Sequence, residues 1–210
     1  MTEASLTQEV VSAMQSMQGD IFARQGDLDG VRDVIREKLD QTFGYMFADI
    51  EREIHLAEAK EADGVGCCKH FPGGGNYLTA LGLLCYTEYM GQWITGKYGQ
   101  RTGTENFTSF FRLMGPRYAE LVGDGVKVYD VFRNGMAHQY TPKKFCEVRM
   151  LGADIKPTPD CGIVRSGEEW PEYRFIVRRY FADFKRVCFA LYDVIVEFPT
   201  MPVDVSKDKS

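Results

Sequence analysis

The feature that most constrains the fold is the segment of residues 77–95, which as a helix is apolar around almost its whole circumference. A helix that is apolar on every side leaves no face for water, so it belongs in the centre of a bundle, with other helices packed around it. Asn76 stands directly before the segment, at the position where an asparagine caps a helix N-terminus. The apolar positions are Leu78, Leu81, Leu83, Leu84, Cys85, Tyr89, Met90 and Trp93.

Glu88 is the one carboxylate of this segment. An unpaired buried charge is costly, so Glu88 must lie on an exposed strip or be buried with a partner. Gly82, Thr87, Gly91 and Gln92 also interrupt the apolar run, whereas a membrane span needs about 20 predominantly apolar residues. No basic-then-apolar segment stands at the N-terminus either. We therefore expect a cytoplasmic protein that does not engage a membrane.

Further helices are predicted on both sides of the central segment. Apolar residues recur at three- and four-residue steps from Val31 to Ile54, which is typical of a long amphipathic helix. This helix is expected to begin at Asp29 and to end near Ala62. Other helices are predicted over residues 104–114, 126–140 and 180–197, with breaks at Gly115-Pro116 and at Pro142.

The pattern changes between residues 143 and 180, where short mixed stretches alternate with the turn residues Pro157, Pro159 and Gly162. This pattern predicts a small β-hairpin inserted or appended after the helix of residues 126–140. The fold class is therefore mainly α, a helical bundle with a small β element. The expected organisation is a loosely ordered N-terminal arm (1–26), one domain (27–198, with 143–180 as the β-containing part) and a C-terminal tail (199–210).

Charge and cysteine content restrict the function. The formal net charge of -5 argues against a strong non-specific nucleic-acid binder, because such binding depends on clustered Lys and Arg. Residues 1–63 hold 6 basic and 14 acidic side chains, whereas residues 64–186 hold 17 basic and 12 acidic ones. Any nucleic-acid surface is therefore expected in the second half. The adjacent Cys67 and Cys68 are a poor layout for a secreted disulfide framework, so reduced thiols are expected.

The sequence R-N-G-M-A-H at residues 133–138 brings several reactive groups together within one predicted helix. Histidine exchanges protons near neutral pH, and the forked charge of arginine matches phosphoryl oxygens. On an ideal α-helix Asp130, Asn134 and His138 share one face, whereas Arg133 lies about 140° around from His138. These two side chains meet only if the arginine curls back or the last turn is distorted. The combination indicates phosphate chemistry, including RNA cleavage without a metal.

Ordinary structural explanations remain open for the same residues. Arg133 and Asp130 are also typical of surface charges, and His138 and Asn134 are typical of a helix end, where a cationic histidine is favourable. Gly135 costs about 1 kcal/mol relative to Ala inside a helix. Its presence therefore predicts the close approach of another backbone or of a ligand, and a partner helix crossing there is one explanation.

The motif resembles the R-x4-6-H motif of HEPN domains, helical families that include many ribonucleases of toxin-antitoxin, abortive-infection and CRISPR systems. Its flanking residues, from Tyr129 to Tyr140, are also similar to the way such motifs end their helix. The order of a long first helix, a central helix with an acidic residue and a late motif helix is similar to the family's bundle over residues 27–142. Residues 143–198 depart from a minimal HEPN bundle.

The resemblance implies a homodimer with both Arg133 and His138 pairs in one cleft, acting on RNA with neither metal nor cofactor. His138 is then general acid or base, Arg133 binds the phosphate and stabilises its charge, and Asn134 orients His138 or the substrate. Glu88, paired with Arg133, and Asp130 are supporting residues. An antitoxin or regulatory protein is the other implied partner. The alternative is a non-catalytic RNA-binding or protein-interaction module that keeps the same bundle.

A second basic region, with Arg174, Arg178 and Arg179 among aromatic residues, fits a single-stranded RNA surface. Half-buried strands and helices also mix these residue types, so both interpretations stay open.

Two loop patterns have weaker functional interpretations. Cys67, Cys68 and His70 stand at spacings that suit a metal, but a closed zinc site needs four ligands, so no metal is expected. Residues 73–76, Gly-Gly-Gly-Asn, precede a helix and match neither common phosphate-binding glycine pattern. They are expected to be a flexible connection and a helix cap.

Overall fold

The computed structural model describes residues 28–58, 76–99, 101–123, 127–143, 146–150, 160–165 and 172–197. The predicted arm (1–26) and tail (199–210) lie outside the described residues. Within the described residues the helices are α2 (Leu28–Glu58), α3 (Asn76–Thr95), α4 (Gly103–Leu113), α5 (Pro116–Gly123), the π-helix η2 (Tyr129–Asn134), α6 (Gly135–Gln139) and α7 (Val177–Glu197). The strands are β1 (Glu147–Arg149), β2 (Ile163–Arg165) and β3 (Tyr173–Ile176).

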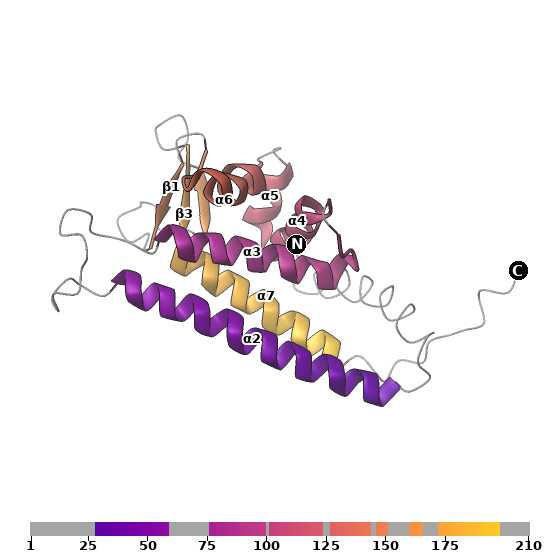
Figure 1. Cartoon of the computed structure of the whole chain (residues 1–210). Helices are drawn as coiled ribbons and strands as arrows, with labels where there is room; N and C mark the ends of the chain where they lie inside the picture. The colour runs from indigo at the N-terminus through magenta and orange to yellow at the C-terminus, as the bar shows by residue number, and fades with distance from the viewer. Residues whose placement is uncertain are drawn as a thin grey trace, which may run out of the picture.

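Helix α3 occupies the centre of the fold, as its apolar circumference predicts. Figure 1 shows α2 and α7 side by side in one layer, with α3 next to both and with α4, α5, α6 and the sheet beyond α3. Among the described residues, α3 contacts α2, α4, α7 and η2. The mainly α fold class with a small β element is confirmed. No helix of the described part combines the length and the apolar character that a membrane crossing requires.

Helices α2 and α7 run antiparallel along their shared seam. Phe43 of α2 packs against Tyr192 near the end of α7, with ring centroids 6.0 Å apart. Further along α2, Glu51 forms an ion pair with Lys185, at 3.1 Å between Oε1 and Nζ. Because residue numbers rise along α2 as they fall along α7, the end of α2 lies beside the beginning of α7.

Helix α5 is the one described helix that the sequence patterns did not predict. The Gly115-Pro116 pair breaks α4, as expected, and Gly115 takes a φ of +144°, which favours glycine. The break is also a start, because Pro116 begins α5. Proline suits the first turn of a helix, where its missing N–H needs no partner.

The predicted small β element is present as a three-stranded sheet with the order β1-β3-β2. Strands β2 and β3 are antiparallel and form the hairpin-like part, with Ile163 opposite Phe175. Strand β1 pairs with β3 in parallel, with Val148 opposite Phe175. Each strand has only three or four residues, too few for a period of two to reveal which strands pair.

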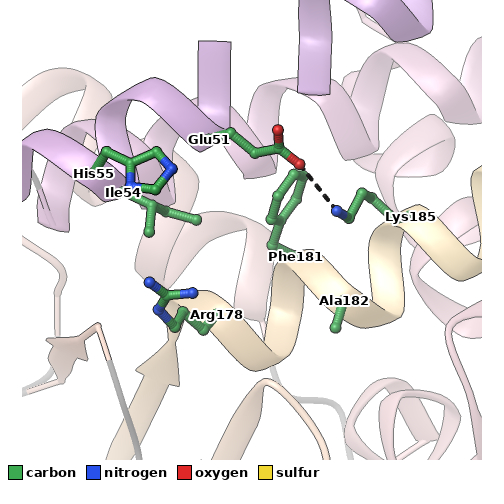
Figure 2. Close-up of a pocket in the computed structure, with 7 residues that line it drawn as sticks. All are labelled: Glu51, Ile54, His55, Arg178, Phe181, Ala182 and Lys185. Carbon is green, nitrogen blue, oxygen red and sulfur yellow. Dashed lines mark hydrogen bonds and ion pairs between the residues drawn. The ribbon is translucent and has the colours of Figure 1, made fainter. Parts of the chain in front are cut away.

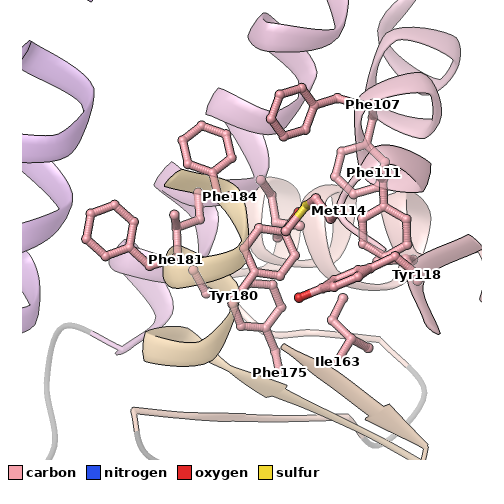
Figure 3. Packing of buried hydrophobic residues seen from close by; sticks show 14 of the residues in the cluster. Phe107, Phe111, Met114, Tyr118, Ile163, Phe175, Tyr180, Phe181 and Phe184 are labelled. Atoms are coloured by element: carbon pink, nitrogen blue, oxygen red, sulfur yellow. The ribbon is translucent and has the colours of Figure 1, made fainter. Parts of the chain in front are cut away.

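Tyr180, in the first turn of α7, links the sheet to the helices (Figure 3). It is fully buried, and its ring stacks on Phe175 of β3 with centroids 4.6 Å apart. The ring of Tyr118, from α5, meets it edge-on at 5.9 Å. The hydroxyl of Tyr180 lies 2.8 Å from Oγ1 of Thr87 on α3. These contacts satisfy the polar end of a buried tyrosine and hold the sheet and α7 against the central helix.

Helices α3 and α4 cross at Gly91, where the backbones are in direct contact. A Cβ atom at this position would lie 1.8 Å from the carbonyl oxygen of Asn106 on α4, so only glycine fits. Asn106 is itself buried, and its Nδ2 donates to the carbonyl of Lys97 at 3.0 Å. The crossing brings the first residues of α4 over Glu88, one turn before Gly91 on α3.

Candidate functional site

The helix of residues 128–139 carries the motif, and its first part is wider than an α-helix. Residues 129–134 form the π-helix η2, in which the N–H of Gly135 binds the carbonyl of Asp130, five residues back. In an α-helix that N–H would bind Val131 instead. The carbonyl of Val131 accepts a hydrogen bond from the backbone N–H of Lys143, at 2.9 Å. The helix ends when Tyr140 adopts the left-handed conformation, with a φ of +60°.

Gly135 is required by the chain's own fold. A Cβ atom there would lie 2.8 Å from the carbonyl oxygen of Thr141 and 2.9 Å from the backbone nitrogen of Lys143. The predicted close approach of another backbone is therefore present. It comes from the segment that follows the helix, so a partner helix is not its explanation.

Arg133 turns toward the central helix and forms an ion pair with Glu88. Its Nε lies 3.2 Å from Oε2 of Glu88, and the two side chains are 25% and 20% exposed. The same Oε2 accepts a hydrogen bond from the hydroxyl of Tyr129, at 3.0 Å. The guanidinium carbon also lies 5.5 Å from the centre of the Tyr129 ring, a cation–π arrangement. Glu88 thus has the pairing partner that a carboxylate on a central helix needs.

The Nε–H of Arg133 does not point at the carboxylate well enough to form a hydrogen bond, although Nε itself is buried. The contact is a largely buried ion pair without the bidentate geometry that arginine and carboxylate groups favour. Part of the guanidinium fork is therefore not committed to Glu88 in paired hydrogen bonds.

Burial raises the pKa of two side chains next to Arg133, those of Tyr129 and Cys85. Burial, with a further contribution from the Glu88 carboxylate and partial relief from Arg133, raises the pKa of Tyr129 to about 12. Burial likewise raises the pKa of the Cys85 thiol, and Arg133 partly offsets this rise. Tyr129 is therefore a hydrogen-bond donor to Glu88, and Cys85 is a thiol rather than a reactive thiolate.

Gly103, the first residue of α4, packs directly onto this group. A Cβ atom on Gly103 would lie 2.6 Å from the Tyr129 hydroxyl and 2.7 Å from Oε1 of Glu88. The crossing of α3 and α4 at Gly91 brings this backbone close. As a result the carboxylate of Glu88 is covered by α4 on one side and meets Arg133 on the other.

Asp130 and Asn134 lie together, as their i and i+4 spacing predicts. The Nδ2 of Asn134 lies 3.5 Å from Oδ1 of Asp130, and Nζ of Lys143 donates to the same oxygen at 2.9 Å. The hydrogen bond from Lys143 lowers the pKa of Asp130, with Asn134 contributing in the same direction and burial opposing it. Asn134 therefore contacts Asp130, and no hydrogen bond joins it to His138.

His138 lies on the exposed part of α6, near its end. Among the described residues we find no hydrogen bond or ion pair for its side chain, and no contact joins it to Arg133. The wider turn of η2 changes the angles of an ideal α-helix, and it directs Arg133 toward Glu88 rather than toward His138. The accessibility of His138 leaves it free to meet a substrate or a second chain.

A cavity of about 650 Å³ adjoins the motif helix on the Asn134 side. Tyr129 forms part of its wall, and the ring of Phe107 lies 5.3 Å from the Tyr129 ring. Sequence patterns did not indicate this cavity, because its lining comes from three separate segments. The lining residues are Thr104, Phe107, Thr108, Phe111, Val122, Lys127, Val128, Tyr129, Asp130 and Asn134.

The three arginines predicted to bind RNA do not line that cavity. On β3, Arg174 alternates with Phe175, whose ring lies 5.6 Å from Phe132 of η2, so Arg174 faces away from the motif helix. Its Nε lies 3.2 Å from Oε2 of Glu147.

The other two arginines, Arg178 and Arg179, are in the first turn of α7. Arg179 lies 3.2 Å from Oδ2 of Asp183 and donates to the carbonyl of Asp160 at 2.8 Å. Arg178 lines a different pocket, between α2 and α7. The structure therefore separates these arginines from the motif helix.

In the described part of the chain, no group of three or more His, Cys, Asp or Glu side chains is arranged to hold a metal ion. The cysteines that the structure describes, Cys85, Cys146, Cys161 and Cys188, are free thiols. Cys67, Cys68 and His70, whose spacing suits a metal, lie outside the described residues, as do the three glycines before Asn76.

Comparison with protein-family models, with curated proteins and with solved structures finds no match to this chain.

Proposed function

We propose that the chain is a metal-independent endoribonuclease of HEPN type, in which Arg133 and His138 act on one phosphodiester bond. The observation that carries the proposal is the ion pair between Arg133 of η2 and Glu88, with the exposed His138 on α6, which continues the same helix. A partly exposed guanidinium anchored to the central helix by a carboxylate is a preorganised group for a phosphate. Phosphate binding would draw on the part of the fork that Glu88 does not engage.

The proposed reaction is attack of a ribose 2′-hydroxyl oxygen on the adjacent phosphorus. The 2′-oxygen bond to phosphorus forms as the bond to the 5′-oxygen of the next nucleotide breaks. The proton of the 2′-hydroxyl passes to a base, and the departing 5′-oxygen takes a proton from an acid. His138 performs one of these transfers, and Arg133 stabilises the charge on the phosphate oxygens. The products are a 2′,3′-cyclic phosphate and a 5′-hydroxyl end.

A homodimer through the motif helix is part of the proposal. One motif helix offers one histidine for a reaction that needs both an acid and a base, and two facing helices would supply two. The end of α6 is suited to such an interface, because His138 is exposed and Tyr140 is 74% exposed. A closed two-fold pairing places the same surface of each copy together. In a defence or toxin-antitoxin setting, an antitoxin or regulatory protein would cover this surface.

The cavity beside Asn134 would hold the nucleotide next to the cleaved bond. Its lining combines apolar side chains with the amide of Asn134, the amine of Lys127 and the carboxylate of Asp130, and pockets for small ligands combine apolar walls with a few polar groups in this way. Asn134 would then contact the substrate rather than orient His138.

A non-catalytic RNA-binding or protein-interaction module is the second candidate. It is favoured by the contacts of Arg133 with Glu88 and Tyr129, which suffice to explain a structural arginine. The two candidates differ in whether the exposed His138 takes part in chemistry.

The deciding experiment is RNA cleavage by the purified protein in excess EDTA, comparing the unchanged chain with His138→Ala and Arg133→Ala. The matched controls are His55→Ala and Arg52→Ala, which alter an exposed histidine and an exposed arginine of α2. We expect cyclic-phosphate ends from the unchanged chain and both controls, and none from either motif variant when all five proteins are folded. Equal cleavage by all five overturns the assignment, and no cleavage by any of them favours the module.

A further inference from the structure

The cavity of about 650 Å³ beside the motif helix is lined by hydrogen-bonding groups of different kinds. Asp130 supplies a carboxylate, which only accepts hydrogen bonds while it is ionised. Lys127 supplies an amine, which only donates, and Thr104 and Thr108 of α4 supply hydroxyls that do both. A ligand that suits this lining therefore presents N–H donors to Asp130 and acceptors to Lys127.

The carboxylate of Asp130 can still accept hydrogen bonds from a ligand. Its Oδ1 accepts one from Nζ of Lys143 at 2.9 Å, and this bond lowers the pKa of Asp130, so the group is ionised at neutral pH. The contact of Asn134 with the same oxygen is long, at 3.5 Å, so a ligand N–H can replace it. Among the described residues no hydrogen bond reaches Oδ2. The carboxylate therefore has room for two N–H donors side by side.

Guanine is the common RNA base that offers two neighbouring N–H donors. Its N1–H and its N2 amino group lie side by side on one edge, with the acceptors O6 and N7 beyond them. Adenine and cytosine each offer one amino group next to a ring-nitrogen acceptor, and uracil offers one N–H between two carbonyl groups. A carboxylate therefore pairs with guanine through both donors, and an amine pairs with its O6 and N7.

Tyr129 connects this cavity to the motif arginine. Its ring forms part of the cavity wall, and its hydroxyl donates to Oε2 of Glu88, the oxygen that lies 3.2 Å from Nε of Arg133. A base in the cavity and a phosphate on Arg133 would therefore lie on adjoining sides of one tyrosine. Phe107 and Val128 would contact the apolar part of the base.

We propose that this cavity selects guanine as the base beside the cleaved bond. Asp130 accepts N1–H and the N2 amino group, and Lys127 donates to O6 or N7. The position beside a cleaved bond rests on the proposed function, whereas the choice of guanine rests on the cavity alone. The volume lies within the range of small-molecule pockets and leaves room for the ribose.

The first test is equilibrium binding of GMP, AMP, CMP, UMP and inosine 5′-monophosphate to the purified protein, in EDTA at constant ionic strength. The inosine nucleotide keeps N1–H, O6 and N7 but lacks the N2 amino group. We expect GMP to bind roughly 5- to 100-fold more tightly than AMP, CMP or UMP, with the inosine nucleotide in between. Equal affinities, a preference for another base, or no saturable binding of GMP overturn the proposal.

Asp130→Asn is expected to bring the affinity for GMP close to that for the inosine nucleotide, because the new amide nitrogen cannot accept a hydrogen bond. Loss of a negative charge favours both nucleotides, so the readout is the ratio of the two affinities. Circular dichroism checks that the variant is folded. An unchanged ratio overturns the pairing with Asp130.

Glu51→Gln is the matched control. It removes a carboxylate that is 52% exposed, against 46% for Asp130, and that also pairs with a lysine. This ion pair, between Glu51 and Lys185, lines a different pocket between α2 and α7 (Figure 2). The preference for GMP should therefore be the same in this variant as in the unchanged chain.

Cleavage of a mixed-sequence RNA, with the bases at the new ends identified, separates this proposal from the proposed function. Cleavage beside guanosine supports both. Cleavage beside all four bases, together with equal nucleotide affinities, overturns the choice of guanine and leaves the nuclease function intact. A preference for GMP without any RNA cleavage supports the guanine site and counts against the nuclease.

Discussion

Nε of Arg133 lies 3.2 Å from Oε2 of Glu88, so the motif arginine is anchored to the central helix α3. This anchor joins two elements that are 45 positions apart in the sequence. It also fixes what a substrate phosphate would meet, because the guanidinium cannot swing freely into solvent while the pair is intact.

Glu88→Gln is expected to lower RNA cleavage by roughly tenfold, because loss of about 1.4 kcal/mol of orientation and charge pairing would appear directly in the barrier. The measurement is the cleavage rate in EDTA at saturating RNA. Glu105→Gln, which removes an exposed ion pair with Lys97, is the matched control and should retain its rate. Equal rates for both variants would show that Glu88 does not position Arg133 for catalysis.

Gly135→Ala is expected to reduce the free energy of unfolding by about 1–3 kcal/mol, because the new Cβ would press on the backbone of Thr141 and Lys143. Gly44→Ala is the matched control, since nothing lies within 4 Å of a Cβ in that part of α2. It should stabilise the protein by about 0.4–1 kcal/mol. Urea denaturation of the two variants measures both effects. An unchanged free energy of unfolding in Gly135→Ala would contradict the close approach of the Thr141 and Lys143 backbone to Gly135.

Tyr129 is expected to titrate with a pKa of about 12, well above the usual value near 10. Its folded-state pKa is raised, so its contribution to stability is complete below about pH 10 and is lost as the pH rises toward 12. The difference in absorbance at alkaline pH between the unchanged chain and Tyr129→Phe isolates this titration. A difference spectrum that titrates near pH 10 would show that the hydroxyl is not buried beside Glu88.

Tyr140→Asp is expected to weaken the proposed dimer and to lower cleavage in parallel, because it places a charge on the exposed end of α6. Aspartate tolerates the left-handed backbone at this position, so local strain should not rise. Tyr98→Asp, at a residue that is 67% exposed and outside the helices, is the control. Sedimentation measures the oligomeric state, and an unchanged dimer in Tyr140→Asp would move the interface elsewhere.

The sequence predicted the helices well where burial imposes a period. Helix α2 and the central α3 were found at nearly their observed positions, and α7 begins at Val177, three residues earlier than expected. Helix α5 is hard to predict because Pro116 both follows the break after α4 and begins α5. The order of the sheet could not be predicted, since β1 and β3 pair in parallel across a long stretch of chain.

Some features of the candidate site could likewise be predicted from the sequence, and others could not. Glu88 was expected either on an exposed strip or with a partner, and the structure gives it a partner in Arg133. Helical spacing placed Asp130 and Asn134 on one face, where the structure brings them into contact. The direction of Arg133 could not be derived from an ideal helix, because η2 is π-helical. No local sequence pattern reveals such a turn, because it depends on the hydrogen bond from the backbone N–H of Lys143 to the carbonyl of Val131. The cavities were also beyond prediction, as each is lined by distant segments.

The π-helical turn of residues 129–134 makes the site sensitive to chain length. Bonds between residues five apart enclose one residue more than an α-turn needs, so a deletion of one residue here would still leave a continuous helix. In that helix the parts before and after the deletion would be rotated relative to each other by about 100°. A single deletion could thus re-aim His138 relative to Arg133 without altering either residue, which gives evolution or protein engineering a one-step means of redirecting the site.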